Sequence, residues 1–261
     1  IKNMNKNILL NYLNEYLNIT WFKDSSKNWL QVDNSKQEIK KIWYAVDANT
    51  YIFEKAKQEN IDLILTHHWI FWWFEQTLTG VAYERTKLLL NNDIGLYSAH
   101  LPLDAHAEVW NNIWLAKAFI RVFWLREEEY ELEKFWDYHG YSIWYWIKFK
   151  NKLHVSNLVI PYAEQMQLLK KFYNFWNLTS FNSVCFVSGS ALNSMHEAKL
   201  KWYDVLVTWE GVHHEMTLAK EIKQSVLIWG HYETEKIGPK LLAYHLKKKF
   251  DIEIEFLDEK Y

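Results

Sequence analysis

Glycine is scarce in this chain of 261 residues, which contains only 7, whereas an average usage of about 7% would supply roughly 18. There are 3 prolines and a single cysteine, Cys185, so an internal disulfide is excluded and a reducing, cytoplasmic location is expected. No apolar run reaches the roughly 18 to 20 residues of a membrane span. The 30 basic and 32 acidic residues leave a net charge of −2, so the broad positive surface of a nucleic-acid-binding protein is not expected.

Tryptophan is in excess, with 16 residues. Hydrophobic residues make up 49% of the chain and charged residues 24%, values that are typical of an ordered globular protein. A fold of this size normally uses glycine at turns and helix ends. Either the chain avoids glycine in an unusual way, or many tryptophans occupy glycine positions.

Strand and helix patterns alternate through the first half of the chain. Short apolar runs predict strands over 41–48, 62–67 and 95–100. Helical spacing predicts the helices that connect and follow them, over 50–60, 83–92 and 111–122. This order predicts a mainly parallel sheet with right-handed crossovers.

The pattern weakens between residues 123 and 149, where the charge-dense stretch 126–134 is expected to be solvated. Further on, the patterns predict helices over 162–175, 192–201, 213–223 and 234–250, and strands over 142–148, 183–188, 204–208, 225–228 and 251–257. We therefore predict two α/β domains with mainly parallel sheets. One comprises residues 1–122 and 228–261, and the other, residues 123–227, is inserted into it.

Three groups of polar residues follow predicted strands: the pair His67 and His68, the stretch 100–104 that ends in Asp104, and the stretch 230–235. Ligands of open α/β sheets gather at the carboxyl ends of the strands. Imidazoles and carboxylates together are the donors of Zn, Fe, Mn, Co or Ni. Each group taken alone has a simpler interpretation, because an isolated histidine is more often a surface or core residue.

The spacing within these groups favours two ions. His231 and Glu235 are four residues apart and can share one helix face. His67 and His68 point in opposite directions if the chain is extended, so they suit two ions about 3.5–4 Å apart with a bridging carboxylate. Glu235 or Asp104 is the candidate bridge.

A fourth polar stretch, 208–215, also follows a predicted strand. Glu210 and His213 are candidates for proton transfer or for contact with the substrate. The alternative interpretation is a polar helix start with a glutamate near the positive end of the helix dipole.

From about Leu9 onward, the chain resembles the Nif-three-like family of dinuclear metal proteins, whose members are also called type-two homologues of GTP cyclohydrolase I. The matching segments are Asp24–Val32, Leu65–Phe71, Ser98–Asp104, Trp110–Leu115, Thr208–His214 and Gly230–Glu235. No single segment identifies the family, but the six segments together are specific for it.

The resemblance implies that the metal ligands are His67, His68, Asp104, His231 and Glu235. It also implies two divalent ions in a cleft between two α/β domains, the second inserted in the first, and assembly as a homohexamer. The implied activity is hydrolysis of a small molecule, with GTP ring opening suggested by the family name. A metal-dependent scaffold or regulatory ring without catalytic activity is the alternative.

The chain departs from this family at glycine positions. Tryptophan replaces the expected glycine at Trp29, Trp69, Trp110, Trp202 and Trp209. Further plausible glycine sites are Trp43, Trp73, Trp114, Trp144, Trp146 and Trp229, whereas Trp72 matches a family tryptophan. Our hypothesis is that UGA codons meaning glycine were read as tryptophan.

Overall fold

The computed structural model describes residues 3–71, 77–106, 108–109, 111–138, 141–159, 171–189 and 191–259. The chain forms two compact units, unit 1 from Ile1–Trp110 and Glu235–Tyr261, and unit 2 from Asn111–Thr234. Among the predicted features, Trp72, Trp73, Trp110 and most of the helix over 162–175 lie outside the described residues.

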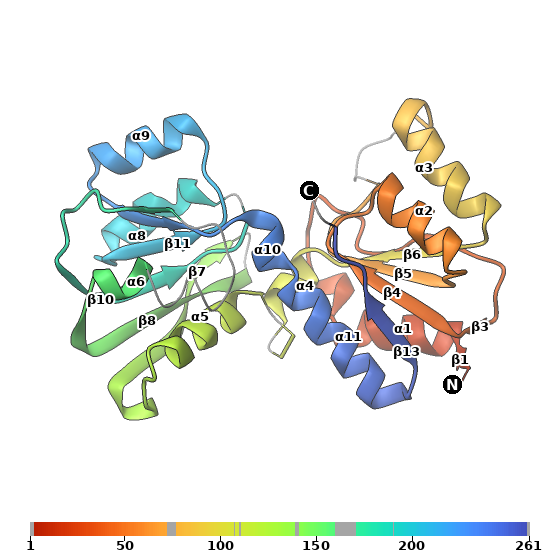
Figure 1. Cartoon of the computed structure of the whole chain (residues 1–261), viewed down its shortest axis with the longest axis horizontal. Coiled ribbons are helices and arrows are strands. Elements are labelled where there is room, and N and C mark those ends of the chain that lie inside the picture. The colour runs from red at the N-terminus through yellow and green to blue at the C-terminus, as the bar shows by residue number, and fades with distance from the viewer. Residues whose placement is uncertain are drawn as a thin grey trace. The chain divides into compact units, whose positions relative to one another are not determined.

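Unit 1 contains a five-stranded sheet in the order β13-β4-β5-β6-β2 (Figure 1). Its elements are β1 (Met4–Asn5), α1 (Lys6–Tyr16), η1 (Ile19–Trp21), β2 (Trp29–Val32), β3 (Glu38–Ile39), β4 (Lys41–Ala45), α2 (Thr50–Gln58), β5 (Leu63–Thr66), α3 (Gly80–Asn91), β6 (Gly95–Ser98), α4 (Leu101–Ala105), α11 (Ile237–Phe250) and β13 (Glu253–Phe256). Strands β13, β4, β5 and β6 are parallel, and only β2 is antiparallel to its neighbour. The predicted parallel sheet is therefore found in unit 1.

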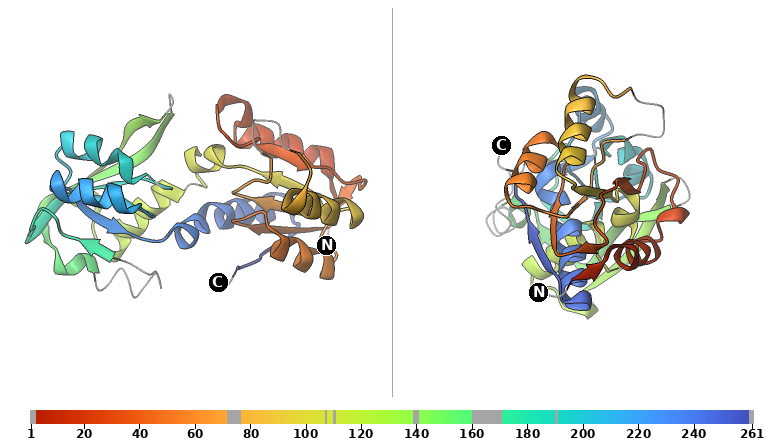
Figure 2. Two further views of the ribbon diagram at one scale, coloured as in Figure 1. Left: turned by 90° about the horizontal axis from the view of Figure 1, so that it is seen from above. Right: turned by 90° about the vertical axis from the view of Figure 1, so that its right-hand side faces the viewer.

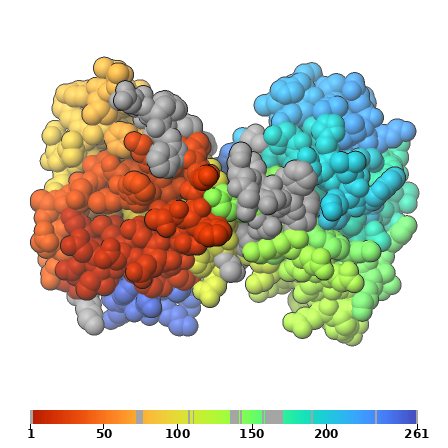
Figure 3. Space-filling view, turned by 180° about the vertical axis from the view of Figure 1, so that it is seen from behind, coloured from red at the N-terminus to blue at the C-terminus, as the bar shows by residue number. Residues whose placement is uncertain are grey.

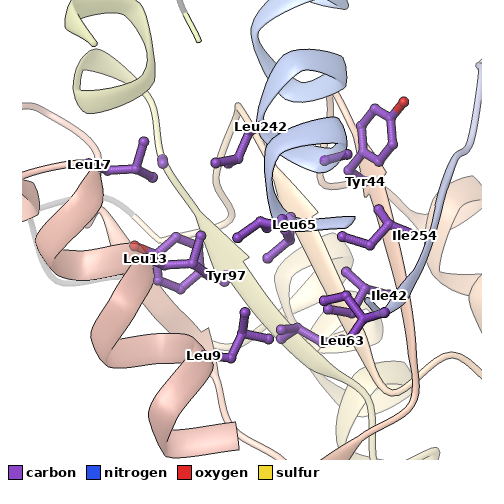
Figure 4. Packing of buried hydrophobic residues seen from close by; sticks show 14 of the residues in the cluster. Leu9, Leu13, Leu17, Ile42, Tyr44, Leu63, Leu65, Tyr97, Leu242 and Ile254 are labelled. Carbon is purple, nitrogen blue, oxygen red and sulfur yellow. The ribbon is translucent and has the colours of Figure 1, made fainter. Parts of the chain in front are cut away.

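Alternate residues of the strands in unit 1 build two cores, one on each face of the sheet. On one face Leu9 and Leu13 of α1 and Leu242 of α11 pack with Leu63 and Leu65 of β5 (Figure 4). On the other face side chains of α2 and α3 cover the opposite side of the same strands. Unit 1 is thus a three-layer α/β/α structure, and Figure 2 shows it from two further sides.

Two helices of unit 1, α1 and α2, begin at an asparagine cap. The side chain of Asn5 accepts a hydrogen bond from the N–H of Ile8 at the start of α1, and Asn49 accepts one from Ile52 at the start of α2. Such caps satisfy backbone donors that have no partner within the helix. Figure 3 shows the two chain stretches of unit 1 on one surface, the first in red to yellow and the last in blue.

Unit 2 contains a six-stranded sheet in the order β7-β8-β10-β11-β12-β9. Its elements are α5 (Asn111–Val122), η2 (Glu127–Glu129), β7 (Tyr130–Tyr138), β8 (Tyr141–His154), α6 (Ser156–Val159), β9 (Lys171–Tyr173), β10 (Ser180–Phe186), η3 (Leu192–Ser194), α8 (Met195–Leu200), β11 (Val205–Thr208), α9 (His213–Glu221) and β12 (Ser225–Ile228). Helix α10 (His231–Glu235) contains the boundary between the two units.

The prediction of a mainly parallel sheet is wrong for unit 2. Only the pairs β10–β11 and β11–β12 are parallel, whereas β7–β8, β8–β10 and β12–β9 are antiparallel. The reason is the hairpin β7–β8, because residues 130–134 of the charge-dense stretch belong to β7 and pair with β8, whereas 127–129 form η2. Residues 171–173, predicted as helix, form the edge strand β9 against β12.

The limits of unit 2 differ from the predicted insertion of residues 123–227. Helix α5 belongs to unit 2 because Phe119 packs against Phe149 and Phe186 of its sheet, at ring-centroid distances of 5.9 and 5.5 Å. At the other end, unit 2 continues beyond β12 to Thr234. Within its sheet, Cys185 is fully buried and burial raises the pKa of its thiol, as expected of a structural cysteine.

Among the described residues, three tryptophans adopt the left-handed backbone region that favours glycine: Trp29 with φ 136°, Trp124 with φ 52° and Trp202 with φ 61°. Trp124 lies two residues after the end of α5, where Leu125 N–H donates to the Ile120 carbonyl. Trp202 follows α8 in the same way, with a hydrogen bond from Tyr203 N–H to the Ala198 carbonyl.

This pattern of bonds is the Schellman motif, whose left-handed residue is most often glycine. Trp29 and Trp202 are among the eleven tryptophans assigned to glycine positions from the sequence, whereas Trp124 is not. Among the buried tryptophans, Trp209 has an indole N–H without a hydrogen-bond acceptor among the described residues.

Asp62, at the start of β5, provides a test of stability in unit 1. Its carboxylate accepts hydrogen bonds from Lys36 Nζ at 2.5 Å and from the backbone N–H groups of Lys40 and Lys41 at 2.7 and 3.0 Å. Burial raises the pKa of Asp62, but these hydrogen bonds outweigh it and hold the pKa below its ordinary value.

We expect Asp62→Asn to lower the free energy of unfolding by about 1–3 kcal/mol at pH 7, because charge-assisted hydrogen bonds are lost. A lowered pKa gives stability that is present above the unfolded value near 4 and is lost as the pH falls through the folded value. The difference between wild type and variant, measured by urea denaturation, should therefore shrink below about pH 4. Glu54→Gln, which removes an exposed pair with Lys57, is the control with little effect. A difference that does not change with pH would contradict this account.

Candidate metal centre

The two adjacent histidines follow β5 directly. The backbone N–H groups of His67 and His68 both donate to the carbonyl of Val46, at 3.1 and 2.8 Å. This ties the carboxyl end of β5 to the segment that follows β4. His67 is fully buried and His68 is partly exposed.

The Nε2 atom of His67 faces two carboxylates without a hydrogen bond. It lies 3.4 Å from Glu235 Oε1 and 3.7 Å from Asp104 Oδ2, and it has no hydrogen-bond partner among the described residues. Both carboxylates are also buried. Ligand atoms that share an ion, each about 2.0–2.2 Å from it, lie about 3–4 Å apart. The three side chains therefore have the chemistry and the spacing of metal ligands.

The carboxylate of Asp47 orients the ring of His68. Its Nδ1 atom lies 2.6 Å from Asp47 Oδ1, and its Nε2 atom lies 3.2 Å from Glu235 Oε2. Metal-binding histidines commonly donate their other ring N–H to a carboxylate in this way. Because Glu235 directs one oxygen toward His67 and the other toward His68, it is placed as a bridging carboxylate would be.

The carboxylates favour positive charge at this centre. Burial lowers the pKa of His67, but Asp104 and Glu235 outweigh it and hold that pKa above its ordinary value. For His68, burial is likewise outweighed by Glu235 and Asp47, which raise its pKa to about 10. The same negative charge of Asp104, Glu235 and Asp47 would favour a bound cation.

We expect metal affinity to rise with pH, because an ion competes with the proton on His68, whose pKa is raised to about 10. Between pH 6 and 8 the increase should be about tenfold per pH unit for each proton displaced. Isothermal titration with Zn²⁺ in buffers of different ionisation enthalpy measures the number of protons released. Binding that is independent of pH and releases no protons would contradict this expectation.

The remaining candidates lie around helix α10. His231 and Glu235 are its first and last residues, so they lie one turn apart on the same face. Within unit 2, His231 Nδ1 lies 2.9 Å from Glu210 Oε1, so Glu210 orients the imidazole. His213 is exposed at the first position of α9.

The structure thus brings together His67, His68, Asp104 and Glu235 in unit 1. Asp47 was missed in the sequence, although it comes two residues after a strand, in the same kind of position as the predicted groups. Asp24, which contacts His100, was also missed. It could have been found from its position at the start of the matching segment Asp24–Val32.

A family model matches almost the whole chain. Residues 4–261 match the model described as Duf34/NIF3 (NGG1p interacting factor 3). The chain belongs to this family.

Relatives and solved structures agree with this assignment. A protein of Pyrococcus horikoshii named "GTP cyclohydrolase 1 type 2 homolog" is 37% identical over 256 residues, which cover 98% of each chain. The structure of TTHA1606 from Thermus thermophilus is 32% identical, with a TM-score of 0.79 and 99% of each chain covered. Protein ybgI, of unknown function, is 25% identical with a TM-score of 0.86 and the same coverage.

Across the residues that the structure describes, no helix is long and apolar enough to span a membrane.

Proposed function

We propose that this chain is a dinuclear metal-dependent hydrolase of a small molecule. The observation that carries the proposal is His67 Nε2, which is buried without a hydrogen-bond partner among the described residues and faces Asp104 and Glu235. A nucleotide is the first candidate substrate, because members of the family are named GTP cyclohydrolase 1 type 2 homologs.

The proposed ligands are His67, His68, Asp104, His231 and Glu235, with Glu235 as the bridge. Two bound divalent ions would polarise a carbonyl, ring carbon or phosphoryl group and lower the pKa of a bound water. Zn, Fe, Mn, Co and Ni all suit these donors. The carbonyl of Ala99 and the carboxylate of Asp47 hold the imidazoles of His67 and His68 through Nδ1.

Glu210 and His213 are proposed to act beside the ligands. Glu210 holds the tautomer and orientation of His231 through Nδ1, and its exposed carboxylate is available to accept a proton from substrate or water. His213 is proposed as a second proton-transfer residue. Assembly as a homohexamer, which the family resemblance implies, is also part of the proposal.

Elemental analysis followed by a substrate screen tests this function. We expect about two metal ions per chain, and metal-dependent turnover of GTP or of a nucleotide phosphoester that is lost in His68→Ala and Glu235→Ala. Metal binding without turnover on any substrate of the panel would favour the alternative, a metal-dependent scaffold. Absence of bound metal from the wild type, after incubation with each of the five ions, would overturn both.

We also propose that glycine is the native residue at Trp29, Trp124 and Trp202, encoded by UGA. The support is the positive φ of all three residues. At Trp209 the support is the buried indole N–H and the matching family segment. The nucleotide sequence of the gene decides between the two readings, because UGG at these positions would overturn the proposal.

A further inference from the structure

A buried carboxylate, that of Asp24, contacts the ring of His100, another histidine of unit 1. Asp24 Oδ2 lies 3.0 Å from His100 Nδ1. The same oxygen accepts hydrogen bonds from Asn28 Nδ2 and from the Leu101 N–H, both at 3.0 Å. The backbone N–H of His100 in turn donates to Asn28 Oδ1 at 2.7 Å. Both the backbone and the ring of His100 are therefore fixed.

The contacts of His100 match those of the two histidines assigned to the centre. Each of the three rings is held through Nδ1: His67 by the carbonyl of Ala99 at 3.2 Å, His68 by Asp47 and His100 by Asp24. In His67 and His68 the other ring nitrogen, Nε2, faces Glu235 at 3.4 and 3.2 Å. The ring of His100 lies 5.0 Å from that of His67 and 6.0 Å from that of His68, between centroids.

His106, directly after the last residue of α4, serves as a comparison, because both of its ring nitrogens contact backbone groups. Its Nε2 atom contacts the carbonyl of Tyr16 at 2.9 Å, and its Nδ1 atom accepts from the N–H groups of Glu108 and Val109. Both ring nitrogens are thus used by the backbone. For His100, the ring hydrogen bonds within the described part of the chain all involve Nδ1.

We propose that His100 is a sixth metal-binding side chain of the centre and that Asp24 is its positioning residue. One ligand atom each from His67, His68 and His100 lie within 4.8 Å of one another. The carboxylate behind His100 is the arrangement that orients metal-binding imidazoles in general. The inference rests on the proposed function, since it requires that the centre binds metal.

Cobalt(II) is the probe for the test. In the Co²⁺-loaded wild type, each imidazole bound through Nε2 gives one exchangeable, strongly shifted proton resonance from its Nδ1–H. We expect four such resonances, from His67, His68, His100 and His231. Three resonances would overturn the inference, and this measurement does not depend on whether any variant folds.

Substitutions of His100 and Asp24 test whether these side chains contribute to Co²⁺ binding. His100→Ala should change the visible absorption spectrum of bound Co²⁺ and weaken its affinity by about 10-fold to 100-fold, and Asp24→Asn should weaken it about 10-fold. His106→Asn is the control with an unchanged spectrum. If the wild type binds Co²⁺ and His100→Ala has the same spectrum and affinity, only this inference fails. If the wild type binds no Co²⁺, the proposed metal function fails with it.

Discussion

Replacing His67 with alanine is expected to remove metal from the centre almost completely. His67 is fully buried, and its Nε2 atom faces Glu235 and Asp104 at 3.4 and 3.7 Å. Without the imidazole the two carboxylates lose their shared partner, and the loss of affinity should exceed about 100-fold, more than the loss of an outer-shell partner. Glu235→Gln should have a similar effect, since Glu235 approaches both His67 and His68.

Metal content after dialysis, measured by inductively coupled plasma mass spectrometry, checks this expectation. His106→Asn is the matched control, because the ring nitrogens of His106 contact backbone groups instead of the carboxylates. Circular dichroism of each variant separates loss of metal from loss of fold. Wild-type metal content in a folded His67→Ala protein would show that the buried nitrogen has no part in binding.

The second large effect concerns stability. Replacing Trp124 and Trp202 with glycine is expected to raise the free energy of unfolding by about 1 kcal/mol each, because a left-handed conformation costs most residues about 1–2 kcal/mol. The two side chains are 86% and 73% exposed, so their removal sacrifices little packing. Trp29→Gly should add at least as much, since its φ of 136° lies in a region populated almost only by glycine.

Thermal unfolding of the single variants and of the triple variant measures the gain. For a protein of this size the three changes together should raise the Tm by about 6 °C or more. Trp21→Gly is the control, because Trp21 is also exposed but does not have a positive φ. That variant should be no more stable than the starting chain. If all four substitutions lower the Tm, the glycine assignment is wrong.

Much of unit 1 could be predicted because its local and tertiary signals agree. The run Leu63–Thr66 is apolar, short and buried on all four residues, as a central parallel strand requires. The helix over 111–122, at the start of unit 2, was predicted with its observed bounds for the same reason. Histidines at the ends of successive strands were expected to gather with carboxylates, and His67, Asp104 and Glu235 do so.

Other features could not be predicted, because they depend on partners far away in the chain. The stretch 130–138 is charged and has no clear period, yet it forms β7 because β8 supplies a pairing partner along its length. Similarly, nothing local shows that Asp24 lies behind His100, 76 residues further on. The left-handed backbone at Trp124 could not be predicted, because a Schellman position is usually marked by glycine and none is present there.

Unit 1 is built from both ends of the chain, so it is completed last during synthesis. Strand β13 pairs with β4, and α11 contributes Leu242 and Leu246 to the same core. A ribosome therefore completes all of unit 2 before unit 1 has its last strand, its last helix or Glu235. A nascent chain that terminates early cannot assemble the carboxylate and histidine cluster. The centre can thus form only in chains translated through to the segment that follows unit 2.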